Sequence, residues 1–186
     1  MSDHPQNITT AELEAALPHL LDAPKDAAMV EQIVYRADYG LRDFPGEIEV
    51  TRECGIPGER WGKAPWAKLP DGSPDPGIQV AILNPRLRDL VWRDRENTPH
   101  PGDTLTADLD FSEANLPEGQ LLSVGSAILR VSNIWNDACV KFKARYGEDA
   151  YWFVRKPEHK HLRLRGLLCA VEKDGIIRVG DVIRKT

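Results

Sequence analysis

The sequence is poor in cysteine: Cys54, Cys139 and Cys169 are widely spaced along 186 residues and never form a CxxC pair. An odd number of scattered cysteines argues against a disulfide framework and against a structural zinc site. Histidine does not supply the missing metal ligands, because His159 and His161 have neither a cysteine nor an HExxH motif nearby. The chain is therefore expected to be held together by its hydrophobic core.

Long apolar runs and runs of one charge are also missing. No window approaches the roughly 18 apolar residues of a membrane helix, and Met1–Thr10 lacks the cationic start and apolar segment of a signal peptide. The formal net charge of −5, without any Lys/Arg run, disfavours a nucleic-acid binder. We therefore expect a cytoplasmic protein with neither a membrane nor a nucleic-acid partner.

What is present predicts one globular domain preceded by a helix. The hydrophobic content of 41% and the charged content of 28% are typical of soluble globular proteins. Thr9 and Glu12 form a capping box that begins a helix, which ends before Pro24. Four leucines are predicted to share its apolar face: Leu13, Leu17, Leu20 and Leu21. We assign residues 1–27 to an N-terminal helical extension and residues 28–186 to the main domain.

Beyond this helix, short segments with the apolar pattern of strands follow one another closely. The predicted strands lie at 29–37, 46–54, 78–84 and after the turn at 101–102, with two more hinged at Gly125. Pro85 begins a short helix, and the proline-rich loop 64–77 with Trp66 is a candidate lid. Asp174-Gly175 predicts the turn of a C-terminal hairpin. Its apolar strand positions would be Val171, Ile176 and Val179. The pattern indicates a mainly β, β-rich α+β fold, a barrel with a few short helices.

The segment NDACVKFKARYG, residues 136–147, places Cys139 at the start of a predicted two-turn helix. Asn136 and Asp137 are good N-caps. With Asp137 as the cap, Cys139 falls in the first turn, where free amides and the helix dipole favour a thiolate. The alternative is a small apolar residue that fills space. The residues alone leave the two interpretations about equal.

The rest of this segment has the spacing of an amphipathic helix. Phe142 and Tyr146 share the stripe that faces the core, and Lys141 and Arg145 share another. Gly147 is expected to end the helix in the left-handed conformation. Of the other cysteines, Cys169 alternates within a strand, which predicts a core position, and Cys54 ends a strand at the rim or in the core.

Five blocks in this order carry a family resemblance: CGIPGERWG at 54–62, DLDFSEANLPEGQLLSVGSAILRVS at 108–132, DACVKF at 137–142, LRLRG at 162–166 and VGDVIR at 179–184. From about Pro24 to Arg184 the chain resembles a stand-alone MOSC domain, the C-terminal domain of molybdenum cofactor sulfurases. The resemblance implies a β-barrel whose single characteristic cysteine is Cys139. Pyridoxal phosphate is not expected, because in the sulfurases it resides on a separate NifS-like domain.

The resemblance also implies the site. In relatives the characteristic cysteine serves sulfur carriage or ligates molybdenum in the pterin cofactor, so Cys139 is the predicted catalytic and metal-binding residue. A thiolate is a soft ligand suited to such a metal, and the pterin phosphate needs cationic or helix-terminal partners. The candidate cofactor-binding residues are Arg60, Asn115, Lys141, Arg163 and Arg165.

Each candidate also has a structural interpretation. Arg60 can serve as a fork for a carbonyl or carboxylate, Lys141 can be solvated, and Asn115 can cap a turn. Arg163 and Arg165 alternate along a predicted strand, so both are expected to point to one face.

Two residues depart from the family pattern. Glu59 stands where an aspartate is usual, and Asn136 stands where close relatives often have a histidine in a segment like HTGC. Without that histidine, the thiol loses an acid, base or orienting group beside it.

Three functions stay open. The first is a protein that binds molybdenum cofactor and carries out redox or sulfur-transfer chemistry on a small N-oxygenated or sulfur-containing substrate, with an electron-donor partner. The second is a metal-free persulfide carrier supplied by a cysteine desulfurase. The third is a non-catalytic small-molecule-binding module, whose thiol would react only near pH ~8.5.

Overall fold

The structure is a computed structural model that describes residues 7–186, so the prediction for the polar start at Met1–Gln6 lies outside the described residues. The helices are α1 Thr10–Leu21, α2 Arg60–Lys63, α3 Pro85–Val91, α4 Val140–Tyr146 and α5 Glu148–Arg155, with 3-10 turns η1 Pro76–Ile78 and η2 Pro157–Leu162. The strands are β1 Ala28–Ile33, β2 Glu47–Val50, β3 Val80–Leu83, β4 Leu105–Ala107, β5 Leu121–Val124, β6 Ala127–Val131, β7 Leu167–Lys173, β8 Gly175–Arg178 and β9 Val182–Lys185.

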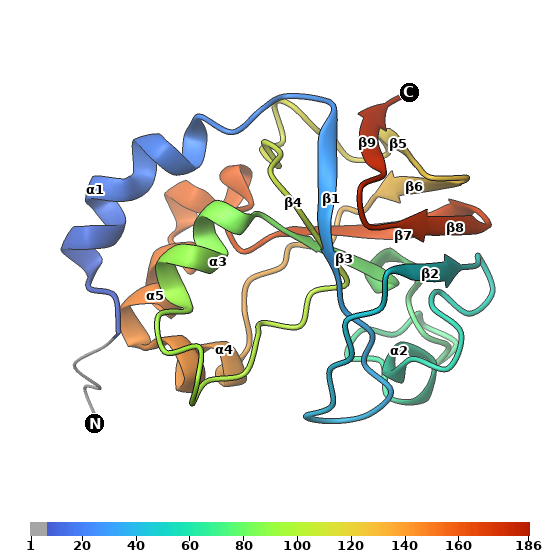
Figure 1. Cartoon of the computed structure of the whole chain (residues 1–186), viewed down its shortest axis with the longest axis horizontal. Helices are drawn as coiled ribbons and strands as arrows, with labels where there is room; N and C mark the ends of the chain where they lie inside the picture. Colours follow the sequence, from blue (N-terminus) through green and yellow to red (C-terminus); the bar gives the residue numbers. More distant parts are fainter. Residues whose placement is uncertain (1–6) are drawn as a thin grey trace.

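Seven strands close into a barrel in the order β1-β4-β3-β7-β6-β5-β9, with β9 pairing back to β1 (Figure 1). The neighbours are antiparallel except β3 and β4, which run parallel. A parallel pair needs a long crossover, and α3 lies within it. The predicted mainly β barrel with a few short helices is confirmed.

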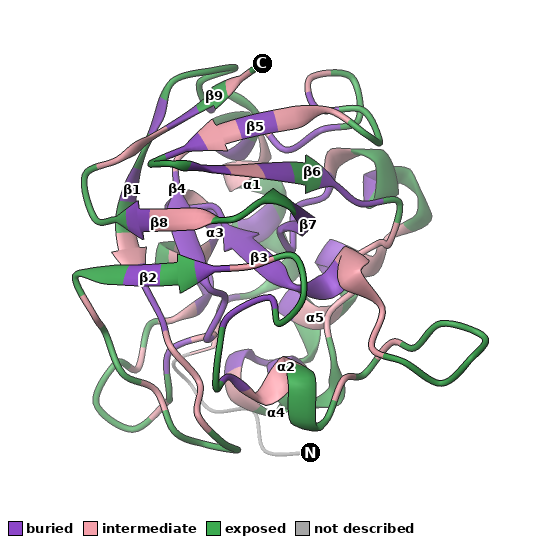
Figure 2. Cartoon of the chain, turned by 90° about the vertical axis from the view of Figure 1, so that its right-hand side faces the viewer, coloured by how far each residue is buried: buried purple, intermediate pink, exposed green. Residues whose placement is uncertain are grey.

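The barrel is filled by apolar side chains from all seven strands, and Figure 2 shows the buried positions along them. Cys169 on β7 belongs to this core and is fully buried. Burial raises the pKa of its thiol to about 12, so it stays protonated at neutral pH. The predicted core position of Cys169 is confirmed.

A second core lies between the helices at one end of the barrel (Figure 1). The predicted capping box is present: the Thr9 hydroxyl accepts the Glu12 amide, and the Glu12 carboxylate accepts the Thr9 amide. Leu13 and Leu20 are buried in this core. Leu21 is 46% exposed, so its predicted place on the apolar face is wrong. The helix therefore packs by its i, i+7 stripe.

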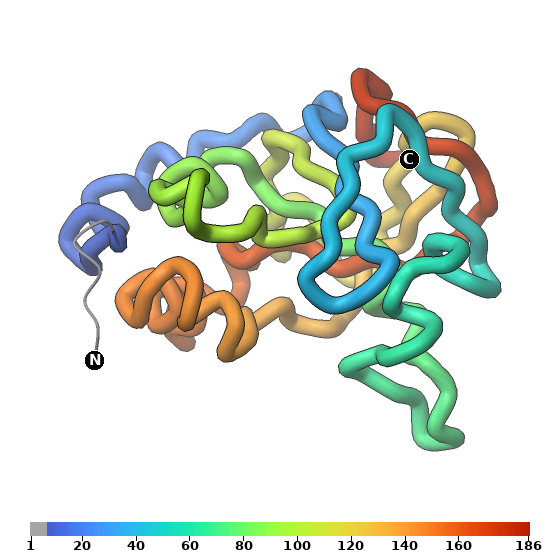
Figure 3. Tube along the Cα trace, turned by 60° about the horizontal axis from the view of Figure 1, so that its bottom comes forward, coloured from blue at the N-terminus to red at the C-terminus, as the bar shows by residue number. Residues whose placement is uncertain are grey.

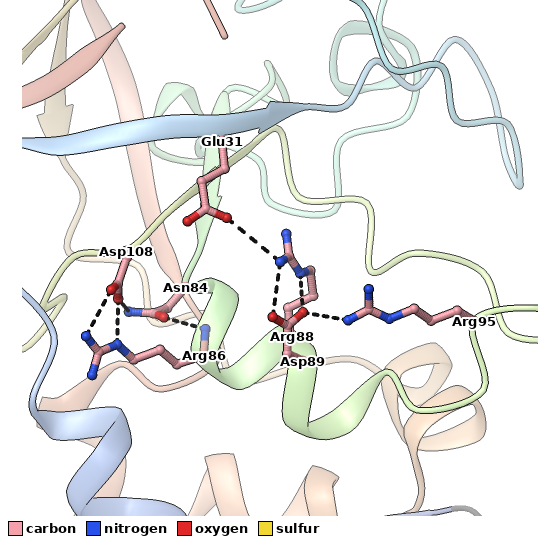
Figure 4. A network of polar contacts seen from close by, with 7 residues as sticks. All are labelled: Glu31, Asn84, Arg86, Arg88, Asp89, Arg95 and Asp108. Carbon is pink, nitrogen blue, oxygen red and sulfur yellow. Dashed lines mark hydrogen bonds and ion pairs between the residues drawn. The ribbon is translucent and has the colours of Figure 1, made fainter. Parts of the chain in front are cut away.

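A network of ion pairs ties the helical end to the barrel (Figure 4). Asn84 caps α3 by accepting the Arg86 amide, and its own amide group donates to the Leu109 carbonyl. Arg86 donates to both carboxylate oxygens of Asp108 and to the His19 carbonyl at the end of α1. Cations and carboxylates balance in this network, which makes it a structural feature and not a binding site for a charged ligand.

The predicted C-terminal hairpin is wrong. The chain does turn at Asp174, but β8 pairs with β2 as a separate two-stranded sheet and has no ladder with β7. The physical reason is burial: Ile177 from β8 joins Ile48 and Val50 from β2 in the barrel core. Val179 lies past the end of β8 and is 47% exposed.

Among residues 7–186, no helix has the length and apolar character needed to cross a membrane.

Candidate functional site

Segments that are far apart in the sequence line a cavity of about 330 Å³. They include the tip of the β1–β2 connection, the start of α2, the turn before β4, the segment that leads into α4, and the turn with Arg165. Figure 3 shows the β1–β2 connection running between the α4 side and the segment after β2, while the proline-rich loop projects from the body. Trp66 from that loop lines the cavity and is 63% exposed. Whether the loop acts as a lid stays a prediction.

Cys139 lies at the rim of this cavity and is exposed. The prediction that it occupies the first turn of a helix capped by Asp137 is wrong, because Cys139 is itself the N-cap residue of α4. The Asp137 carboxylate instead pairs with Arg155 of α5. A helix of seven residues that begins after the thiol provides little dipole, so the neighbouring side chains decide the charge environment of Cys139.

The residue before the thiol holds an unusual backbone conformation. Ala138 has φ +66°, which non-glycine residues rarely adopt because Cβ approaches the carbonyl oxygen. Arg155 holds this segment by donating to the carbonyls of Asp137 and Ala138. Such strain persists where the surroundings impose it, and it is common at functional sites. At the other end of α4, Gly147 has φ +97° and ψ 163°, so it ends the helix as predicted but outside the left-handed helical region.

The cavity is rich in cations. Those that line it are Arg36, Arg42, Arg60, Lys141, Arg145 and Arg165, against the carboxylates Asp38, Asp103 and Asp137. Within residues 7–186, Arg42, Arg60, Lys141 and Arg145 have no carboxylate within 4 Å. Burial, followed by the charge of Arg145, holds the pKa of Arg42 below its ordinary value. The cavity is therefore electropositive and favours an anionic ligand.

Three predicted binding residues meet beside Cys139. Arg60, Lys141 and Arg165 all line the cavity with it. Lys141 is joined there by Arg145, which shares its helix face as the i, i+4 spacing predicts but was not among the predicted binding residues. Phe142 and Tyr146 on the opposite stripe are buried, as predicted.

Two predicted residues do not line this cavity. Asn115 donates to the carbonyls of Lys25 and Asp110 and accepts from Lys185, which is a turn-stabilising role. Arg163 is buried and donates to the carbonyls of Phe111 and Leu116, and burial lowers its pKa.

The expectation that Arg163 and Arg165 share one strand face is wrong. Both lie in the turn after η2, and Arg163 has φ +49°. That turn sends the two side chains apart: Arg163 contacts backbone carbonyls, whereas Arg165 lines the cavity.

Arg165 forms a buried ion pair that no sequence signal indicated. Its Nη1 donates to Asp103 Oδ1 over 2.8 Å, and the two side chains are 10% and 4% exposed. Burial alone would lower the pKa of Arg165, but the charge and hydrogen bond of Asp103 outweigh it and raise that pKa. Several buried polar atoms around this pair have no hydrogen-bond partner within the described chain: Arg42 Nε, His100 Nε2, Asp103 Oδ2 and Arg165 Nε.

Glu59, which stands where the family usually has an aspartate, has a structural role. Its buried carboxylate accepts two hydrogen bonds from the Arg36 guanidinium, at 2.8 and 2.9 Å, and one from the Arg36 amide. The Arg60 amide in turn donates to the Arg36 carbonyl. Glu59 thereby fixes the start of α2, which carries Arg60 to the cavity.

The turn before β4 is held by a buried histidine. His100 Nδ1 accepts the Gly102 amide over 3.0 Å, and the ring meets Phe44 and Trp92 edge-on. Burial lowers the pKa of His100 from 6.5 to about 4, so the ring is neutral at neutral pH. It therefore positions Asp103 without adding to the positive charge of the cavity.

We expect this histidine to make the protein sensitive to acid. Between pH 6.5 and pH 4 the unfolded chain binds a proton on His100 that the folded chain does not, so stability falls as pH falls. The loss is on the order of 3 kcal/mol by pH 4. Urea unfolding across this range should show His100→Gln losing less stability than the wild type over the same interval. Equal losses would contradict the assignment.

The fold and the site define a class: a closed mixed barrel with an exposed cysteine at the rim of an electropositive cavity. Residues 96–184 match the family model described as MOSC domain, a range that contains Cys139, Lys141 and Arg165. Over these residues the chain contains a MOSC domain.

Solved structures share this fold at low sequence identity. The YuaD protein from Bacillus subtilis superimposes with a TM-score of 0.60 at 17% identity, covering 84% of this chain and 94% of that one. YiiM from Escherichia coli gives 0.55 at 17% identity, covering 85% and 69%. YiiM from Geobacillus stearothermophilus gives 0.54 at 14% identity, covering 86% and 75%. The comparison with curated proteins gave no match.

Proposed function

We propose that the cavity binds the molybdenum-containing pterin cofactor, with Cys139 as the protein ligand of the metal. The observation that carries this proposal is the convergence on one cavity of one exposed thiol and four cations that have no carboxylate partner among residues 7–186. The fold fits a domain related to molybdenum cofactor. When bound, the cofactor would supply redox or sulfur-transfer chemistry on a small N-oxygenated or sulfur-containing substrate.

The residues present fit this group. Within residues 7–186, no cluster of three His, Cys, Asp or Glu side chains could hold a metal ion, so one thiolate must be supplemented by ligands that the pterin brings. Arg60, Lys141 and Arg145 would hold the phosphate by charge-assisted hydrogen bonds. The unpartnered atoms of Asp103 and Arg165 supply a buried acceptor and a buried donor beside the cavity. An anionic ligand with polar edges matches this set.

In this proposal the protein contributes binding and orientation. The hydrogen bonds from Arg155 to the carbonyls of Asp137 and Ala138 would hold the backbone that leads to Cys139. Asn136 lines the cavity where the family resemblance predicts a histidine, so it can orient a ligand by hydrogen bonding but cannot exchange a proton near neutral pH. Any proton needed by the substrate would come from another group or from an electron-donor partner.

Metal analysis tests the proposal. Wild-type protein from a host that makes the cofactor should carry molybdenum in proportion to the chain, and Cys139→Ser should lose it because an alcohol is a poor ligand for a soft site. Cys54→Ser is the matched control: its thiol is also exposed but lies outside the cavity, so molybdenum should stay. A wild-type protein without molybdenum, or equal contents in wild type and Cys139→Ser, would overturn the proposal.

The exposure of Cys139 also supports a second candidate, a metal-free persulfide carrier supplied by a cysteine desulfurase. A carrier thiol must reach another protein, and the neighbouring Val140 is 75% exposed, which leaves this face open. The same purified protein separates the two functions. A carrier would contain no molybdenum and would gain the mass of one sulfur atom on Cys139 after incubation with a desulfurase.

A further inference from the structure

Tyr39 covers two of the cations that the cavity offers to an anion. Its ring lies 4.2 Å from the guanidinium carbon of Arg60 and 4.1 Å from the Lys141 ammonium nitrogen. Both distances are within the range of a cation–π contact. Arg60 comes from α2 and Lys141 from α4, so one aromatic ring links the two sides of the cavity.

The segment that carries Tyr39 is anchored at its base by the neighbouring strands, while its tip is held by side chains: Lys63 donates to the Ala37 carbonyl and Arg42 to the Gly40 carbonyl. At the base, Tyr35 and Asp43 exchange two backbone hydrogen bonds, and the Val34 amide donates to the Thr104 carbonyl. The backbone amides of Tyr39 and Leu41 donate only to Asp38, within the tip itself. The ring is 60% exposed despite its two cationic neighbours.

Gly40 forms the bend of this tip, and the space beside it is open. It has φ +78°, and nothing lies within 4 Å of the position that a Cβ would take. The tip is held by the two cation–π contacts of Tyr39 and by hydrogen bonds to the carbonyls of Ala37 and Gly40. Displacing Tyr39 would break the two cation–π contacts and would leave the Tyr35–Asp43 bridge in place.

An oxyanion and the aromatic ring compete for the same two cations. An ammonium or guanidinium group binds a phosphate oxygen through charge-assisted hydrogen bonds, which are stronger than its contact with an exposed ring. A phosphate is also attracted at longer range by Arg42 and Arg145, which form no ion pair in the part of the chain that the structure describes. A ligand with a terminal phosphate is thus able to replace Tyr39.

We propose that Arg60 and Lys141 form an oxyanion subsite at the mouth of the cavity, occupied by the Tyr39 ring until a phosphate-bearing ligand displaces it. This inference rests on the proposed function, because it concerns how the same cavity admits its ligand. In the free protein the ring covers both cations. When the phosphate binds, the tip around Tyr39 swings outward and the mouth opens.

Direct titration with inorganic pyrophosphate tests this subsite. The cofactor-free 186-residue chain would be titrated by calorimetry at constant ionic strength. Tyr39→Ala removes both contacts and should bind about 5- to 30-fold more tightly than the wild type. Tyr39→Phe keeps the ring and should stay within about 2-fold of the wild type.

Leu41→Ala is the matched control, since Leu41 is in the same tip, lines the cavity and is 56% exposed, but makes no cation–π contact. Its affinity should equal that of the wild type. Lys141→Ala in the Tyr39→Ala background should lose the gain, which places the anion at this subsite. Unchanged or weaker binding by Tyr39→Ala, or no pyrophosphate binding by any variant, would overturn the inference.

Failure here and failure of the proposed function give different results. If Tyr39→Ala tightens pyrophosphate binding while the wild type acquires no molybdenum, the subsite stands and the cofactor assignment falls. If Cys139→Ser loses its molybdenum but Tyr39→Ala binds pyrophosphate with the affinity of the wild type, the cofactor assignment stands. The proposed displacement of Tyr39 by phosphate is then wrong.

Discussion

Asp103→Ala is expected to lower the free energy of unfolding by about 3–5 kcal/mol, the usual cost of leaving a buried charge without its partner. Arg165 is almost fully buried, and Asp103 is its carboxylate partner in the part of the chain that the structure describes. The Nε of Arg165 already lacks a hydrogen-bond partner among the described residues. A small rearrangement of the side chain would therefore do little to offset the loss of Asp103. Urea unfolding at neutral pH measures the loss.

Two comparisons separate this effect from the loss of a surface charge. Asp174→Ala removes an exposed carboxylate that lies 3.6 Å from the Arg52 guanidinium and accepts the Arg52 amide at 2.8 Å, and it should cost about 1 kcal/mol. In a double-mutant cycle, Asp103→Ala combined with Arg165→Met should cost clearly less than the sum of the single variants, because neither charge is then left alone. A loss as small as that of Asp174→Ala would show that water reaches Arg165.

Leu13→Ala is expected to destabilise the protein by about 2–5 kcal/mol, as large-to-small substitutions in packed cores do. Leu13 on α1 is fully buried in the second core, where α1 contacts α3 and α5. Leu13 fills the space between α1, α3 and α5, so its truncation leaves a cavity there. The substitution leaves the Thr9–Glu12 capping box intact. Thermal and urea unfolding of the full chain measure the change.

The control on the same helix is Leu21→Ala, which removes a side chain that is 46% exposed and should cost less than about 1 kcal/mol. Equal, small effects of both variants would mean that α1 is attached loosely, as a helical extension at residues 1–27 would be. A single cooperative transition with a large effect of Leu13→Ala would instead make α1 part of one folding unit with the barrel. The predicted boundary between residues 27 and 28 stays a prediction until then.

The position of the cavity connects these stability effects to function. Asp103 and His100 hold the turn before β4, Glu59 fixes the start of α2, and Arg155 holds the segment before Cys139. Each of these side chains is an internal support for a residue that faces the cavity. The Asp103 and Arg165 pair is therefore both a stabilising contact and part of the wall that a ligand would meet.

The sequence by itself determined the features that depend on near neighbours. Thr9 caps α1, Pro85 begins α3, Gly125 separates β5 from β6, and Cys169 is in the core. Each of these rests on a hydrogen bond across two to four residues, a fixed φ, or the alternation of apolar side chains. Such signals do not need the rest of the chain, so they can be read before the fold is known.

Only the tertiary structure decided which distant segments meet. β8 pairs with β2 because that arrangement covers the barrel core with Ile48 and Ile177, a choice that no local hairpin signal contains. Asp103 meets Arg165 across 62 residues, and Tyr39 meets Lys141 across a still longer stretch. Such contacts arise when the barrel closes, because closure sets the direction of every connecting loop. The chemistry of Cys139 was suggested by its sequence neighbours, but its charge environment was set by residues that the fold brings to it.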